Sequence, residues 1–211
     1  MKKPAMDFFL DPNQPLATCS RKECNDDCPQ NEILHCHFSG IDLLKFLLAV
    51  LPAFVIGGIG IFNLQGWKIL MAWILFFISY FGLIEIRVMC SHCPHYAEPG
   101  HNLKCWANYG SPKLWTYRPG PMSTTENIIF IGGLTVIVGL PTAVFLLHAE
   151  WTILLLFSFA LTIAILFMRT TMCAHCINFA CPLNGVDPKI KSSFMDMNPS
   201  IASAWENPDD N

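Results

Sequence analysis

The chain has 211 residues, of which 53% are hydrophobic and only 14% are charged. Soluble domains carry about 25% charged residues, so this composition indicates a membrane protein and argues against a soluble enzyme. The net charge of -3 also argues against the basic surface that a nucleic-acid-binding protein needs.

Residues 1–38 are polar and form a predicted cysteine-rich arm. The arm contains four prolines, which disfavour one long helix. Lys2 and Lys3 are not followed by an apolar segment, so we expect no cleaved signal peptide.

Four apolar runs follow, at about residues 41–62, 67–89, 127–148 and 150–168. Each approaches the roughly 20 residues that a transmembrane helix needs. Burial inside a soluble protein is excluded by size, because too few residues remain to cover four such helices. The sequence therefore predicts an all-α integral membrane protein with four transmembrane helices.

Landmarks in the first two runs recur in the last two. Capping serines stand at positions 39 and 123 and tryptophans at 67 and 151, which is a spacing of 84 in both cases. The first cysteines of two related motifs, Cys90 and Cys173, stand 83 residues apart. We interpret the four helices as two repeated hairpins.

These features divide the chain into six segments. They are the arm (1–38), a first transmembrane hairpin (39–89), a Cys/His loop (90–122), a second hairpin (123–169), a second cysteine cluster (170–185) and a polar tail (186–211). The tail contains three prolines and ends in Asp-Asp-Asn, so we expect it to be extended or disordered.

Basic residues predict the orientation in the membrane. Twelve of the 13 lysines and arginines lie in or beside the arm, the 90–122 loop and the tail, and only Lys68 lies at the opposite end. The positive-inside rule therefore places both termini and all ten cysteines on the cytoplasmic side of the cell inner membrane. Because cytoplasmic thiols stay reduced, metal or redox sites are favoured over a disulfide framework.

The two cysteine motifs have the form Cys-x-His-Cys followed by Cys-x-x-Asn. Each motif supplies three cysteines, so we expect the arm to fold back and complete the coordination of one or both sites. The candidate metal ligands are Cys90, Cys93, Cys105, Cys173, Cys176, Cys181, Cys19, Cys24, Cys28, Cys36, His92 and His175.

Thiolates at this spacing suit two kinds of metal centre. Iron–sulfur clusters take four cysteine ligands, and a structural zinc site takes four cysteines or three with a histidine. We favour two iron–sulfur centres, because a second equivalent centre at the same membrane face extends an electron path. Zinc remains the alternative, and metal-free thiol chemistry a further one.

Glu85 is an ionisable residue inside the second apolar run. It has two interpretations: a neutralised interfacial pair with Arg87, or the proton acceptor of a quinol bound between the helices, with Tyr80 and Trp73 in the wall. The second interpretation makes Glu85, Tyr80 and Trp73 candidate residues for binding a quinone cofactor.

In span number and in cysteine clusters at helix ends, the chain resembles the membrane-integral polyferredoxins. It differs from them in cysteine spacing, with three rather than four cysteines in each motif. We predict an electron-transfer subunit that links a quinone pool to a cytoplasmic redox partner, as a non-catalytic subunit of a membrane oxidoreductase complex. The alternatives are a zinc-stabilised membrane scaffold and, less favoured, a metal transporter.

Overall fold

The computed structural model describes residues 33–36, 38–98 and 100–206. These residues form helices and no strand, which confirms the all-α class. The helices are α1 (Gly40–Gln65), α2 (Trp67–Ser79), α3 (Glu85–Val88), α4 (Thr124–Leu147), α5 (Trp151–Phe167), α6 (Pro188–Met197) and α7 (Pro199–Glu206).

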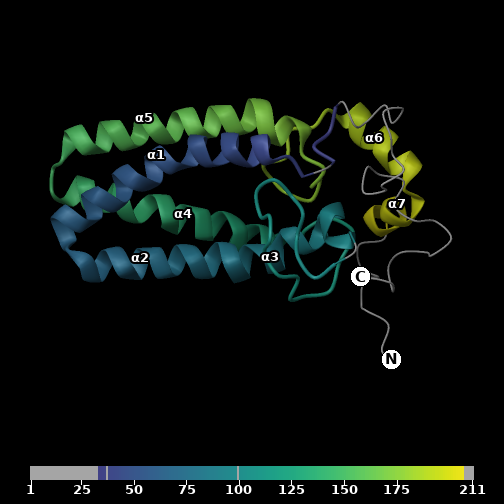
Figure 1. Cartoon of the computed structure of the whole chain (residues 1–211), viewed down its shortest axis with the longest axis horizontal. Coiled ribbons are helices and arrows are strands. Elements are labelled where there is room, and N and C mark those ends of the chain that lie inside the picture. The colour runs from purple at the N-terminus through teal and green to yellow at the C-terminus, as the bar shows by residue number, and fades with distance from the viewer. Residues whose placement is uncertain (1–32, 37, 99, 207–211) are drawn as a thin grey trace.

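Four helical segments are long and apolar enough to cross a membrane, namely Gly40–Gln65, Trp67–His92, Thr124–Leu147 and Trp151–His175. They form one elongated bundle, in which α1 lies beside α5 (Figure 1). Large apolar side chains cover its outside; Leu147 is 83% exposed and Leu155 is 70% exposed. Lipid solvates such a surface, whereas water would not. The chain is therefore a multi-pass helical membrane protein.

Side-chain caps determine where two of the spans begin. Ser39 accepts a hydrogen bond from the amide of Asp42 (3.3 Å) at the start of α1. Ser123 and Glu126 form a reciprocal capping box at the start of α4. Each cap satisfies an amide of the first helical turn that has no partner within the helix.

Two aromatic side chains of the second span fix it against α4. The indole nitrogen of Trp73 donates to the carbonyl of Ile137 (3.0 Å), and the Tyr80 hydroxyl donates to the carbonyl of Phe130 (2.6 Å). Both side chains are almost fully buried. The Tyr80 ring lies against Gly133, where a side chain would overlap it.

The second and the fourth spans both change their helical winding near the same end of the bundle. The helix that begins as α2 passes through a π turn at Tyr80–Ile84, and α5 passes into one at Met168–Met172. Tight 3₁₀ turns follow at Cys90–His92 and Cys173–His175. The change from wide to tight winding ends each span at its cysteine motif.

The expectation of an extended tail is wrong for residues 188–206. Asp187 caps α6 by accepting from the amide of Lys189 (2.8 Å), and α7 follows directly. Phe194 of α6 is fully buried, and Ile201 of α7 is 3% exposed. These apolar side chains pack against the cysteine loops and stabilise helices too short to form alone. Residues 207–211 lie outside the described part of the chain.

The close fit of Tyr80 against α4 generates a stability prediction. Gly133→Ala would force the hydrogen-bonded Tyr80 ring to move, and we expect it to lower the free energy of unfolding in detergent by about 2 kcal/mol. Gly132→Ala is the matched control, because nothing lies within 4 Å of its added methyl group. Thermal unfolding should separate the two variants, and equal melting temperatures would refute this packing.

Candidate functional site

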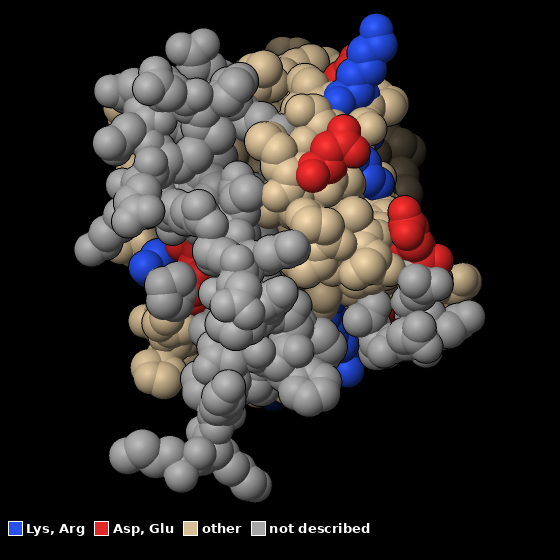
Figure 2. All heavy atoms as spheres, turned by 90° about the vertical axis from the view of Figure 1, so that its right-hand side faces the viewer, with Lys and Arg blue, Asp and Glu red and all other residues tan. Residues whose placement is uncertain are grey.

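The loops that follow α3 and α5 meet α6 and α7 at one end of the bundle (Figure 1). Their buried side chains form one small core, which includes Ile86, Cys90, Cys93, Tyr96, Leu103, Tyr117, Ile177, Phe179, Phe194 and Ile201. Figure 2 faces this end: over its described part, charged side chains of both signs are scattered among uncharged surface. Residues from opposite halves of the sequence thus share one apolar environment.

The two Cys-x-His-Cys turns have the same backbone path. The amide of Cys93 donates to the carbonyl of Cys90 (2.9 Å), and that of Cys176 donates to the carbonyl of Cys173 (3.4 Å). In each turn the second cysteine leaves the 3₁₀ turn in an extended conformation. The backbone of both cysteines in each turn is therefore held in place by the end of a helix.

Backbone amides point at the sulfurs of four cysteines. The bonds run from His95 to Cys93, from Ala107 and Asn108 to Cys105, from Asn178 to Cys176, and from Leu183 and Asn184 to Cys181. The Asn108 amide nitrogen lies 3.1 Å from the Cys105 sulfur. In both motifs the donor stands two or three positions after its acceptor. Such bonds stabilise a thiolate, the form of cysteine that binds metal.

The two motifs contact each other. Asn178, next to the second motif, donates its side-chain amide to the carbonyl of Met89 beside the first (3.4 Å). Burial raises the pKa of Cys93, and the neighbouring Cys176 raises it further. The sulfurs of the two motifs therefore lie close enough to interact electrostatically.

Burial governs the protonation of these thiols when no metal is bound. It raises the pKa of Cys105 to about 11 and that of Cys181 to about 12, against the opposing effect of the amide bonds. Both groups are therefore thiols at neutral pH in the metal-free protein. A bound cation would supply the missing counter-charge.

Glu85 is 3% exposed and faces the first motif. Its carboxylate accepts two hydrogen bonds from the Asn108 side-chain nitrogen (3.2 and 3.0 Å), and the Cys90 thiol lies 3.4 Å away. Arg87 lies instead beside Glu126, at 3.6 Å. The expected pairing of Glu85 with Arg87 is therefore wrong, because the π turn and Asn108 draw the carboxylate inward.

Tyr80 and Trp73, expected to line a quinone site with Glu85, hold the bundle together. Each uses its polar atom for a hydrogen bond to a carbonyl of α4. These bonds give both side chains a structural role, whatever else they contact.

The arm can be followed only in part. Cys19, Cys24 and Cys28 lie outside the described residues. Cys36 is buried and disulfide-bonded, a state in which its sulfur does not bind metal as a thiolate. The backbone of His35 donates to the carbonyl of His175 (2.7 Å), so the end of the arm lies against the second motif.

The two candidate histidine ligands have other neighbours. His92 lies 3.4 Å from Glu126, and the Nδ1 atom of His175 lies 2.7 Å from the carbonyl of Ile33. Among residues 33–36, 38–98 and 100–206, no three Cys, His, Asp or Glu side chains are placed to hold a metal ion. The donor chemistry suits a thiolate-bound metal, but the ligands would have to converge on it.

Two asparagines have roles that the sequence analysis did not assign. Asn108 links Glu85 to Cys90, its side-chain nitrogen lying 3.2 Å from the Cys90 sulfur. Asn184 donates to the carbonyls of Cys176 (2.7 Å) and Asn178 (3.0 Å). The sequence did contain a signal for these roles, because each asparagine stands three residues after the last cysteine of its motif.

No family model, curated protein or solved structure matches the chain. The class is thus defined by the fold alone, as a multi-pass helical membrane protein.

The raised thiol pKa values predict slow alkylation. In metal-free protein at pH 8, we expect iodoacetamide to modify Cys105 and Cys181 more than about a hundredfold more slowly than in unfolded protein. Their rates should rise with pH towards about 11 and 12. Peptide mass spectrometry of timed samples measures both rates, with protein in sodium dodecyl sulfate as the unfolded reference. Equal rates at pH 8 would contradict the prediction.

Proposed function

We propose that this protein is a membrane-integral electron-transfer subunit whose two cysteine motifs hold iron–sulfur centres. The observation that carries the proposal is the set of amide-to-sulfur hydrogen bonds, which recurs at equivalent cysteines of both motifs. Hydrogen bonds to cysteine sulfurs are a principal means by which proteins tune iron–sulfur centres. The buried surroundings of these sulfurs would further limit solvent access.

The ligands would be Cys90, Cys93, Cys105, Cys173, Cys176 and Cys181, completed by cysteines of the arm other than the disulfide-bonded Cys36. Metal binding commonly brings ligands together as the site folds, which accounts for the lack of a ready three-ligand group among the described residues. The contact between the motifs favours two centres near each other. Oxidation of a quinol to a quinone releases two electrons and two protons, and two one-electron centres would accept the electrons.

The proposed proton acceptor for that quinol is Glu85, since it is buried at the end of the second span beside the first motif. Tyr80 and Trp73 would support the helices on either side of such a site through their bonds to α4. We further propose that the two hairpins are copies of one unit. Serine caps, π turns and 3₁₀ turns at corresponding places support this duplication.

The same donor chemistry supports a second function, a zinc-stabilised scaffold that anchors a membrane complex. The observation in its favour is the small size of the core around the motifs, because small cores often require a structural metal. In that case the metal would carry no electrons and would contribute only folding energy.

Metal analysis distinguishes the two functions. Anaerobically purified protein should be brown and contain iron and acid-labile sulfide. Cys176→Ser should lose most of the iron and visible absorbance, while the exposed Asn102→Ser at the same end of the bundle should retain both. A colourless protein with stoichiometric zinc would falsify the electron-transfer proposal and support the scaffold.

We also propose that the cysteine-bearing end faces the cytoplasm, as the distribution of lysine and arginine indicates. An impermeant maleimide added to intact cells should label Leu147→Cys, the last residue of α4 at the opposite end, and should not label Ser203→Cys in α7. Both positions are exposed, so the comparison reports sidedness. The reverse labelling pattern would overturn the orientation.

A further inference from the structure

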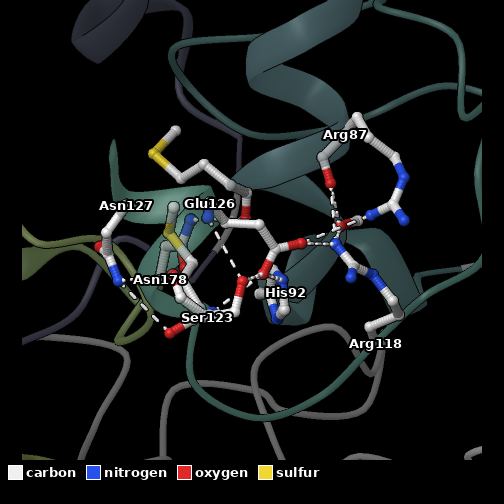
Figure 3. A network of polar contacts seen from close by, with 10 residues as sticks. Arg87, His92, Arg118, Ser123, Glu126, Asn127 and Asn178 are labelled. Atoms are coloured by element: carbon white, nitrogen blue, oxygen red, sulfur yellow. Dashed lines mark hydrogen bonds and ion pairs between the residues drawn. The ribbon is translucent and has the colours of Figure 1, made fainter. Parts of the chain in front are cut away.

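A cluster of charged residues lies where the second span ends and α4 begins. Figure 3 shows Arg87, Arg118 and His92 gathered around Glu126 of the first turn of α4. None of these four side chains contacts a cysteine sulfur through a hydrogen bond described above. The cluster is therefore separate from the six cysteines proposed as metal ligands, and it contains His92, which the sequence analysis had given as a further candidate ligand.

The carboxylate of Glu126 does not balance the charge around it. Its Oε1 atom lies 2.5 Å from Nη2 of Arg118 and 3.6 Å from Nη1 of Arg87. Its Oε2 atom accepts from the amide and the hydroxyl of Ser123, both at 2.9 Å. One carboxylate thus faces two guanidinium groups and leaves a net positive charge.

Two arginine nitrogens of the cluster are buried without a hydrogen-bond acceptor in the described part of the chain. They are Nη1 of Arg87 and Nε of Arg118. The His92 side chain is only 5% exposed, and its neighbours are the Glu126 carboxylate, 3.4 Å from Nε2, and the backbone of Gly120. Leaving buried donors unpaired is costly, so these nitrogens call for an external acceptor.

The start of α4 adds to the attraction for an anion. α4 has 24 residues, and its amino end carries the partial positive charge of the helix dipole. Phosphate groups bind readily at such helix ends, where amides and arginines point at the same oxygens. Glu126 repels an anion at its own oxygens, so the ligand must bind on the side of the unpaired nitrogens.

We propose that Arg87 and Arg118 bind a phosphate group, supplied by the headgroup of an anionic membrane lipid. The cluster lies at the end of two membrane spans, at the level where headgroups are found. The Arg87 side chain is 42% exposed, so a lipid reaches it from outside the bundle, and its buried Nη1 atom then has to turn outward to meet the phosphate. Free inorganic phosphate offers the same chemistry and is the alternative source.

Arg169 provides a matched control on the fourth span. It lies at the corresponding end of that helix and is exposed. General attraction of basic residues to anionic lipid acts on Arg87 and Arg169 alike. Only a specific binding site would make lipid binding depend on Arg87 more than on Arg169.

The test uses the full chain in nanodiscs of phosphatidylglycerol mixed with phosphatidylcholine, with native mass spectrometry to count retained anionic lipids. We expect Arg87→Gln to weaken retention about tenfold, the loss of one charge-assisted hydrogen-bonding group. Arg169→Gln should retain lipid as the unmodified chain does. Arg87→Lys, which keeps the charge but loses the planar fork, should give an intermediate result.

A second arm uses pure phosphatidylcholine nanodiscs with 10 mM inorganic phosphate, on the order of ordinary buffer concentrations. If phosphate stabilises the unmodified chain in these nanodiscs and does not stabilise Arg87→Gln, the result would support the phosphate site and assign it to free phosphate. Equal loss of lipid by Arg87→Gln and Arg169→Gln, or by neither, would overturn the proposal. Thermal unfolding of each variant in phosphatidylcholine alone separates weaker binding from loss of the fold.

Discussion

The desolvation of sulfur is the constraint on which the cysteine-bearing end of this molecule depends. A neutral thiol is buried at little cost, whereas a buried thiolate needs hydrogen-bond donors and a counter-charge. The chain supplies the donors as backbone amides two or three residues after Cys93, Cys105, Cys176 and Cys181. It does not supply the counter-charge from the described residues next to these sulfurs, and that imbalance underlies the proposal of a bound metal.

The second span and α4 connect the helical bundle to its cysteine-bearing end. Tyr80 and Trp73 fix the second span to carbonyls of α4, and the π turn begins at Tyr80 itself. The position of Glu85 and Cys90 is therefore set by packing inside the membrane-spanning region. A distortion of the Tyr80 contact should be felt at the first motif, one to three turns along the same helix.

Two carboxylates at similar heights in the bundle have opposite surroundings. Glu126 lies between arginines and completes a helix cap, so it is an anion held by charge. Glu85 lies among apolar residues, with Asn108 and the Cys90 thiol as its partners. Local environment thus makes the first carboxylate part of an ion-pair network at a helix start and leaves the second buried beside a thiol.

The sequence alone determined the four membrane spans, because length and apolar composition are sufficient to require lipid. It also located the helix starts at Ser39 and Ser123, since N-caps act through residues three apart. Only the tertiary structure decided what the polar residues do. Arg87 stands two residues from Glu85 but pairs with Glu126, and Asn108 reaches Glu85 across a loop. The α6–α7 helices likewise depend on Phe194 and Ile201 finding a core made by distant segments. Such contacts follow from how separate elements pack, and local sequence patterns carry no record of that packing.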